Sequence, residues 1–307
     1  MIQGFARLPM FHRRQVLKAA LPTAALGALQ TLAGLAQATS PPASSRMPVL
    51  FIGHGSPLNA LADNAFSRAL VAWGQRLLRP RAILVVSAHW LTPGVTAVGV
   101  QARPRTIHDF GGFPKALFDM QYPAPGSPEL AREAMAVVRR AKVMPREDWG
   151  LDHGSWTVLH HLYPAADVPV FQLSIDYSQP AAFHHAMGRE LAALRDKGVL
   201  IVGSGNVVHN LGALDRVEGL SAQASRAWAQ GFDDAVKRAL ARRDDMGLVH
   251  YARLAGDAAA TAVPTPDHYW PFLYALGASD AVGEPVVNVF EGFQAGTLSM
   301  RCVQFGA

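Results

Sequence analysis

The chain has 307 residues, of which 28 are Lys or Arg, 23 are Asp or Glu and one is Cys. Half of the residues are apolar and 17% are charged, which excludes a disordered chain and leaves ample material for one large α/β domain or two small ones. A single Cys excludes an internal disulfide framework and any zinc site built on several thiolates.

Residues 1–38 have the features of an export signal. Arg13 and Arg14 precede an uncharged stretch rich in Ala and Leu, and the segment closes on Ala36-Gln37-Ala38, a small-x-small sequence that signal peptidase accepts. The paired arginines resemble a twin-arginine signal, which exports folded proteins and suits a protein that acquires a metal in the cytoplasm. We therefore expect a periplasmic protein; the alternative is an uncleaved anchor helix.

The predicted signal also carries most of the excess positive charge. The formal net charge of +5 falls to +1 without residues 1–38, because this segment holds four basic residues and no acidic ones. A nearly neutral mature chain gives no support for a nucleic-acid partner or an anionic membrane surface. We expect a flexible start at residues 39–46, one domain over residues 47–307, and no stable membrane insertion after cleavage.

After residue 46, continuous apolar runs alternate with amphipathic patterns. The runs have the length of strands buried on both faces, and they cover residues 48–52, 81–86, 168–175, 199–202 and 285–290. Helical patterns cover residues 127–141, 181–196 and 221–243. The first helix opens with Ser127 as its N-cap and Pro128 at its first position. This alternation predicts a single α/β domain with a mostly parallel central sheet flanked by helices.

Histidines follow several of the predicted strands. His54, His89 and His209 come after the first, second and fourth apolar runs, and His268 precedes an apolar helical run. In an open parallel sheet the ligand crevice lies beyond the carboxyl ends of the strands, so we expect these side chains to converge there. Each one alone is more often structural, but four together favour a mononuclear metal site of three His plus an acid/base His.

Several better-known site motifs are missing from the sequence. The chain has no HExxH motif, no GxSxG elbow, and no GxxxxGK[ST] or GxGxxG phosphate loop after its first strand. Imidazole-rich sites suit Fe(II), Zn(II) and Cu(II). The spacing therefore indicates a metal site and leaves the identity of the metal open.

Seven short motifs occur in order between residue 47 and the C-terminus. They lie at residues 53–59 (GHGSPLN), 87–90 (SAHW), 108–114 (HDFGGFP), 122–126 (YPAPG), 152–156 (DHGSW), 205–210 (GNVVHN) and 265–268 (TPDH). Together they resemble the class III extradiol ring-opening dioxygenases, specifically the 4,5-DOPA dioxygenase branch. The resemblance implies a single-domain α/β fold and a non-haem metal that opens catechol rings with dioxygen.

The resemblance also implies roles for four histidines. His54 and His89 match the two metal ligands shared across the class, and His268 matches the third ligand position, where the wider class uses Glu. His209 matches the residue assigned as acid/base, which can also ligate the metal in the resting state. The expected metal is Fe(II) for catalysis with Zn(II) as a possible occupant, because His in place of a carboxylate removes one negative charge from the ligands.

Other site residues have two readings each. His153 is predicted to be a second catalytic residue, with Asp152 orienting it, or else a cap of the helix that follows. His108 is predicted to bind substrate in a mobile cover, or to lie in an ordinary turn. Trp90 is predicted to stack on the aromatic substrate, or to fill the core. We expect no catalytic role for His160, His161, His184, His185 and Cys302.

The resemblance implies an oxidoreductase that opens a DOPA-like catechol at the 4,5 bond and incorporates both atoms of dioxygen. A catechol must lose a proton to chelate a metal through both oxygens, and a His can accept that proton near neutral pH. The expected partners are a small catecholic substrate and dioxygen, while the oligomeric state stays open. Two alternatives also stay open: a non-catalytic metal-binding protein on the same fold, and a zinc-dependent hydrolase.

Overall fold

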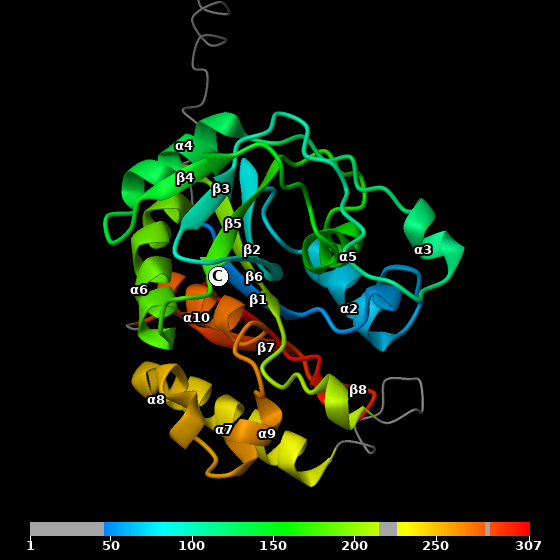
Figure 1. Cartoon of the computed structure of the whole chain (residues 1–307), viewed down its shortest axis with the longest axis vertical. Helices are drawn as coiled ribbons and strands as arrows, with labels where there is room; N and C mark the ends of the chain where they lie inside the picture. The colour runs from blue at the N-terminus through cyan, green and yellow to red at the C-terminus, as the bar shows by residue number, and fades with distance from the viewer. Residues whose placement is uncertain (1–45, 215–225, 280–282) are drawn as a thin grey trace, which may run out of the picture. The chain divides into compact units, whose positions relative to one another are not determined.

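The computed structural model describes residues 46–214, 226–279 and 283–307. The predicted export signal and residues 39–45 lie outside this part of the chain. In the described part an eight-stranded sheet has the order β4-β3-β5-β2-β6-β1-β10-β7, and β8 and β9 form a separate pair (Figure 1). The strands are β1 (Val49–Gly53), β2 (Ala82–Thr92), β3 (Thr96–Gly99), β4 (Val143–Arg146), β5 (Val170–Asp176), β6 (Val199–Gly205), β7 (Val286–Phe290), β8 (Phe293–Gln294), β9 (Leu298–Ser299) and β10 (Cys302–Phe305).

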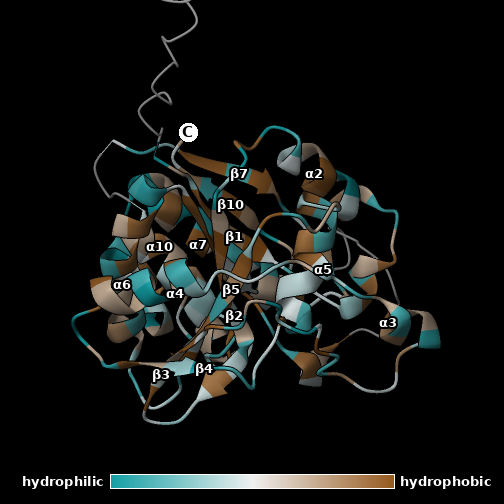
Figure 2. Ribbon diagram, turned by 90° about the horizontal axis from the view of Figure 1, so that it is seen from above, coloured by the Kyte–Doolittle hydropathy of each residue, from teal (hydrophilic) through white to brown (hydrophobic). Residues whose placement is uncertain are grey.

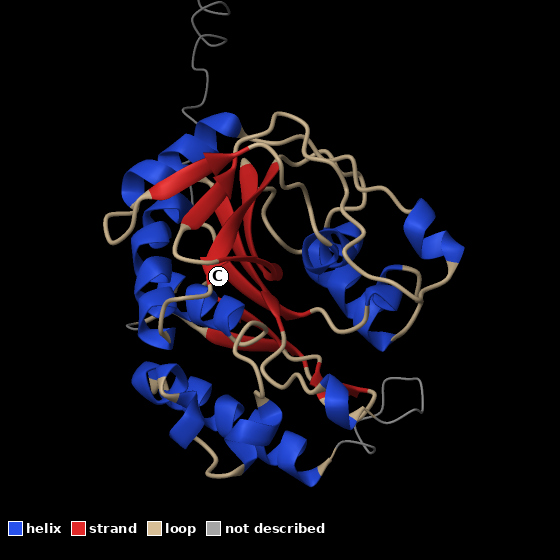
Figure 3. Cartoon of the chain, in the orientation of Figure 1, coloured by secondary structure: helices blue, strands red, loops and turns tan. Residues whose placement is uncertain are grey.

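Helices cover both faces of the sheet (Figure 3). The α-helices are α2 (Ala65–Gly74), α3 (Lys115–Asp119), α4 (Pro128–Val137), α5 (His153–Leu162), α6 (Ala181–Leu191), α7 (Ala227–Arg242), α8 (Asp245–Val249), α9 (Ala258–Ala262) and α10 (Trp270–Ala278). Short 3-10 helices are η1 (Pro57–Ala60), η2 (Ala192–Lys197), η3 (Leu211–Ala213) and η5 (Tyr251–Arg253). The predicted α/β class is therefore confirmed.

The central strands β5, β2, β6 and β1 are all parallel to one another. Strands β10 and β7 add antiparallel pairs at one end, and β3 is antiparallel to β5 at the other. Because the parallel strands are buried on both faces, they appear in the sequence as continuous apolar runs. The mostly parallel centre was predicted, whereas short strands such as β4, which exposes three of its four residues, have no such signature.

Neighbouring residues of each central strand enter two separate cores. In β1, Leu50 and Ile52 pack in the core that contains α2 and α5, whereas Val49 and Phe51 pack in the core that contains α6 and α10. Figure 2 shows the apolar strands lying between these two groups of helices. The two cores hold the strand ends firmly, and it is at these ends that the functional side chains lie.

Several element boundaries differ from the sequence prediction, and three of the differences have a visible structural cause or bear on the site. Strand β2 continues to Thr92, with an irregularity in its pairing to β5 between Val86 and Leu91, so that His89 lies within the strand. Helix α4 ends at Val137, earlier than predicted, because Val138 already has extended backbone. The last turn of the helix predicted to end at residue 196 is the 3-10 helix η2, which stops before Gly198 at φ +80°.

No helix in the described part of the chain combines the length and apolar character needed to span a bilayer. The apolar stretch considered above as an uncleaved anchor helix lies at residues 19–36, outside the described residues.

Candidate metal centre

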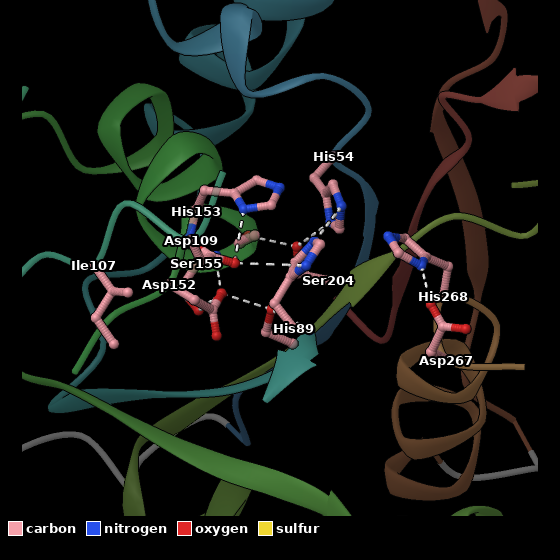
Figure 4. Close-up of polar contacts among 12 residues, drawn as sticks. His54, His89, Ile107, Asp109, Asp152, His153, Ser155, Ser204, Asp267 and His268 are labelled. Carbon is pink, nitrogen blue, oxygen red and sulfur yellow. Dashed lines mark hydrogen bonds and ion pairs between the residues drawn. The ribbon is translucent and has the colours of Figure 1, made fainter. Parts of the chain in front are cut away.

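His54, His89 and His268 meet at one edge of the sheet, as the sequence predicted. One ring nitrogen from each lies within 4.8 Å of the others. His54 follows β1, His89 lies within β2, and His268 sits in the loop before α10 (Figure 4). Within the described chain, three sequence-distant imidazoles therefore face one small volume.

Backbone contacts set two of these positions. The N–H of His54 donates to the Gly205 carbonyl at 3.0 Å, and the N–H of Asn206 donates to the His268 carbonyl at 2.8 Å. A Cβ on Gly205 would lie 2.1 Å from the His268 carbonyl oxygen, so only glycine lets the loop approach the end of β6 this closely.

Hydrogen bonds orient the rings so that metal-binding nitrogens face inward. The Ser204 hydroxyl donates to the Gly154 carbonyl, so it accepts from Nδ1 of His54 at 3.0 Å, which leaves Nε2 of His54 unprotonated. His268 likewise uses Nδ1 for a hydrogen bond, to the Asp267 carboxylate, so its other ring nitrogen, Nε2, stays available for a metal. A carboxylate or hydroxyl on the outer nitrogen is the usual way a protein fixes a metal-binding His.

The separation of the inner nitrogens also fits a shared cation. Nε2 of His54 lies 3.2 Å from Nε2 of His89. Metal–nitrogen bonds of about 2.0–2.1 Å place two tetrahedral ligands about 3.3 Å apart. The residues therefore fit a metal by donor type, orientation and spacing.

The surroundings keep His54 and His89 in the neutral form that binds metals. Burial, and then the neighbouring His268, lowers the pKa of His54 well below its ordinary value. Burial, and then His153, does the same for the pKa of His89. Protons therefore compete weakly for the inner nitrogens, and the cost of burying a charge is avoided when the rings stay neutral.

Asp109 is a site residue to which the sequence analysis gave no role. Its carboxylate accepts from the backbone N–H and from Nδ1 of His153, both at 2.9 Å, and lies 3.6 Å from Nδ1 of His89. One donor atom from each of Asp109, His89 and His153 lies within 4.8 Å of the others, so these three side chains are also close enough to share a metal. Although burial favours the protonated acid, the hydrogen bonds and charge of His153 lower the pKa of Asp109.

The orienting carboxylate of His153 is thus Asp109, and the prediction of Asp152 for this role is wrong. Asp152 is the N-cap of α5 and accepts from the Ser155 N–H at 3.2 Å. It also accepts from Ser87 and Gln172, each at 2.7 Å. The helix cap that was the alternative role for His153 is therefore Asp152. The His153 side chain instead lines the cavity.

His209 lies beside the three histidines without joining their group. Its ring stacks on that of His268, with centroids 3.4 Å apart and planes 4° from parallel. Burial, and then His268, lowers the pKa of His209 to about 3. His209 is therefore neutral at the edge of the cavity, and it is not part of the group in which ring nitrogens of His54, His89 and His268 lie within 4.8 Å of one another.

The histidines open into a cavity of about 640 Å³, a volume typical of small-molecule sites. The described residues that line it are His54, Gly55, Ser56, Pro57, Leu58, His89, Phe110, Phe113, His153, His209, Leu211, Leu214, His268, Gln294, Ala295 and Leu298. The three clustered histidines, together with His153 and His209, are among them.

Two residues predicted to bind substrate lie outside this lining. Trp90 is buried and stacks on Trp149 at a centroid distance of 5.6 Å, which corresponds to its core alternative. His108 bonds the Met120 carbonyl at 3.0 Å through Nε2 and packs on Phe110. The aromatic contacts in the cavity come instead from Phe110 and Phe113 of the same loop.

The residues expected to be non-catalytic are also placed away from the cavity. Nε2 of His161 bonds the Asn59 carbonyl, and the His184 ring lies between the Tyr274 hydroxyl and the Gln179 carbonyl. Cys302 is buried in β10, and burial raises its pKa to about 12, which leaves an unreactive thiol.

Comparison with known proteins extends this picture. Residues 49–297 match the family described as the catalytic LigB subunit of aromatic ring-opening dioxygenase. The chain is 50% identical over 267 residues to the 4,5-DOPA dioxygenase extradiol of Escherichia coli K12, which covers 86% of this chain and 96% of that protein. It is 36% identical over 253 residues to the Beta vulgaris protein of the same name, which covers 79% of this chain and 91% of that protein.

A crystal structure of an uncharacterized Escherichia coli K12 protein also matches, with a TM-score of 0.73 and 44% identity over 85% of this chain and 100% of that one. The motifs, the fold and these similarities agree: the chain belongs to the aromatic ring-opening dioxygenases, in the 4,5-DOPA dioxygenase branch of the class III extradiol enzymes.

Proposed function

We propose that this protein is a metal-dependent extradiol dioxygenase that opens a catechol ring with dioxygen and incorporates both oxygen atoms. DOPA-like catechols, cleaved at the 4,5 bond, fall within the proposed substrate range because relatives are named for that activity. The observation that carries the proposal is the orientation of His54, His89 and His268 toward one point in a cavity of catechol-accommodating size.

His54, His89 and His268 would hold the metal. Fe(II) is the proposed catalytic ion, and Zn(II) is a proposed alternative occupant, since both accept imidazole ligands. A bound divalent metal favours the deprotonated catechol and brings substrate and dioxygen together in one site. Three neutral ligands leave the full charge of the ion available to a dianionic or monoanionic catechol.

The remaining histidines would handle protons. Nδ1 of His153 is engaged by Asp109, so Nε2 is the ring atom through which His153 would exchange a phenolic proton. His209 stacks on the ring of His268 and lines the cavity, where it would accept a second proton and later return it. Two bases on separate elements, α5 and the loop after β6, would thus serve the two hydroxyl groups of one catechol.

The direct test loads metal-free protein with Fe(II) under anaerobic conditions and then supplies catechol, DOPA and dioxygen. We expect one dioxygen consumed per ring opened, with both atoms of labelled dioxygen in the product. Tight metal retention without oxygen uptake across the panel would favour the non-catalytic binder, and turnover of ester substrates with Zn(II) in the absence of oxygen would favour the hydrolase.

Export to the periplasm through the twin-arginine route is a separate proposal. Its support is the sequence of residues 1–38, with Arg13 and Arg14 ahead of an uncharged stretch. We expect the mature N-terminus to follow Ala38 and an Arg13→Lys, Arg14→Lys variant to accumulate uncleaved in the cytoplasm. N-terminal sequencing of the periplasmic and cytoplasmic fractions measures both, and a cleaved double variant in the periplasm would overturn the assignment of the route.

A further inference from the structure

We infer that Asp152 is a positioning residue for the metal centre and that it holds His54 and His89 at the separation that a shared cation needs. This inference deepens the proposed function, since it rests on a metal bound by the histidine group. The Asp152 carboxylate is fully buried, and no step of the proposed ring opening uses it. Two routes of contacts lead from this carboxylate to the two histidines.

The first route holds the irregular part of β2 that presents His89. The pairing of β2 with β5 stops after Val86 and resumes at Leu91, and His89 lies in this interval. The Ser87 hydroxyl donates to Oδ1 of Asp152 at 2.7 Å and accepts from the N–H of His89 at 3.3 Å. An interruption of this kind re-aims the side chains that it carries, so the bond to Asp152 fixes the direction in which His89 leaves the strand.

The second route runs through the first turn of α5 to His54. Asp152 caps this helix, since Oδ1 accepts from the N–H and the hydroxyl of Ser155 at 3.2 and 3.3 Å. The cap fixes the turn in which the Gly154 carbonyl accepts from Ser204, and the Ser204 hydroxyl in turn accepts from Nδ1 of His54 at 3.0 Å (Figure 4). Loss of the cap would therefore loosen the group that orients His54.

The two routes are coupled by close packing at Gly154. A Cβ at this position would lie 2.5 Å from the Ser87 hydroxyl oxygen and 2.9 Å from Cδ2 of His89. Only glycine lets the helix turn approach the His89 ring this closely. A displacement of the turn would move the supports of both imidazoles at once, so their separation depends on how firmly Asp152 holds it.

The other side of the carboxylate is anchored to β5. Nε2 of Gln172 donates to Oδ2 of Asp152 at 2.7 Å, and Oε1 of the same amide accepts from the Asp152 N–H at 3.0 Å. Four hydrogen bonds thus converge on one buried carboxylate, from Ser87, twice from Ser155 and from Gln172. A helix cap needs only one of them, and the neutral Asn64 is sufficient to cap α2. The additional bonds tie the turn to the two strands behind the histidines.

The test measures metal binding and the surroundings of the metal rather than turnover. Competition with a chelating dye gives the Zn(II) affinity of the full-length protein, and the visible spectrum of the Co(II)-loaded protein reports the ligand geometry. We expect Asp152→Ala to weaken Zn(II) binding about 10–100-fold, the usual effect of removing a group that holds a metal ligand, and to alter the Co(II) spectrum. Unchanged Zn(II) affinity would overturn the inference.

Asn64→Ala is the matched control for this variant. Asn64 caps α2, which has ten residues like α5, and it is not among the residues that line the cavity. Both alanine variants remove a helix cap and should lower stability, but only Asp152→Ala should change Zn(II) affinity and the Co(II) spectrum. Equal losses of affinity in the two variants would show a general effect of helix loosening and would count against the role of Asp152.

Two further variants keep the inference testable if Asp152→Ala does not fold. Ser87→Ala removes only the link to the irregular part of β2, and we expect about tenfold weaker Zn(II) binding. Asp152→Asn places an amide donor opposite the Gln172 amide nitrogen, and adding Gln172→Glu restores an acceptor there. The double variant should therefore recover most of the Zn(II) affinity that Asp152→Asn loses. Normal affinity in Ser87→Ala, or no recovery in the double variant, would contradict the positioning role.

Failure of the proposed function would look different. If the unaltered protein binds Zn(II) and Co(II) but opens no catechol, ring opening fails, and the loss of affinity in Asp152→Ala would still support the inference. If catechol is opened normally and Asp152→Ala binds Zn(II) as tightly as the unaltered protein, only the inference about Asp152 fails.

Discussion

Two buried polar clusters in this protein have opposite designs. Around Arg301, the guanidinium donates to Asp233, to Asn288 at 2.7 Å and to Glu291 at 3.0 Å, so the charges are paired within the cluster. Around His54, the outer ring nitrogens are bonded, while inner nitrogens face a cavity and each other. A cluster whose hydrogen bonds are complete stabilises the fold, whereas one that leaves aligned lone pairs unused is built to receive a ligand.

The largest expected effect comes from removing a metal ligand. His54→Ala or His89→Ala should reduce the bound metal from about one ion per chain to almost none, because two imidazoles cannot replace three. Elemental analysis after dialysis against metal-containing buffer measures this. His250→Ala, at an exposed histidine away from the cavity, is the control and should retain the metal. Full metal content in His54→Ala would show that the ion binds elsewhere.

Removing the proposed acid/base should separate binding from turnover. His209→Ala should retain most of the metal and lose about 10²–10⁴-fold in kcat, the usual contribution of a positioned acid/base. Metal content and oxygen uptake are measured on the same preparation. Undiminished turnover would remove the proposed role of His209, and loss of the metal would instead make it a ligand.

The Arg301 cluster should respond in stability rather than in metal binding. Asp233→Ala leaves the buried guanidinium without its main partner and should lower the free energy of unfolding by about 3–5 kcal/mol. Urea denaturation of the metal-free protein measures the loss. Replacing both residues, Asp233→Leu with Arg301→Met, should be less damaging than the single change, and the metal content of the folded fraction should stay normal in both.

The link between Asp109 and His153 should have an intermediate effect on activity. Asp109→Asn keeps the size of the side chain but removes the charge that orients His153, and we expect kcat/KM to fall about 10–100-fold. The fall should appear in kcat more than in KM, with bound metal retained. Asp148→Asn, at an exposed aspartate, is the control and should behave as the unaltered protein.

The smallest expected effect concerns a histidine whose bonds are complete. Burial lowers the pKa of His184 to about 4, so the folded protein keeps it neutral while the unfolded chain gains a proton below about 6.5. Stability from His184 is therefore full at high pH and falls as pH drops below the unfolded value, by about 0.7 kcal/mol between pH 7 and 6. His184→Gln should remove that part of the slope in urea denaturation at the two pH values.

The sequence was sufficient to predict the parts of the fold with strong local signals. The apolar runs of β1, β5 and β6 were found because strands buried on both faces have no polar alternation. The convergence of His54, His89 and His268 followed from their positions near strand ends. These features depend on short stretches of chain and on a general rule of parallel sheets.

Side-chain partners across the chain were harder to predict. Asp109 and Asp152 each lie next to a histidine in the sequence, and only the folded chain shows that Asp109 reaches His153 across 44 positions while Asp152 caps α5. Trp90 likewise carries no local sign that its partner is Trp149. Such pairings depend on packing between distant loops, for which a single sequence has no periodic signal.

The close approach of His268 to Gly205 has a consequence for how the ligand set can change. The position of residue 268 is set by its main chain, through the bond from Asn206 and the space left by the glycine, and not by its imidazole. An acidic side chain could be exchanged at this point without rerouting the polypeptide. The net charge of the ligand set thus depends on the side chain at residue 268, whereas the position of the loop depends on its backbone contacts. The charge can change while the backbone stays the same.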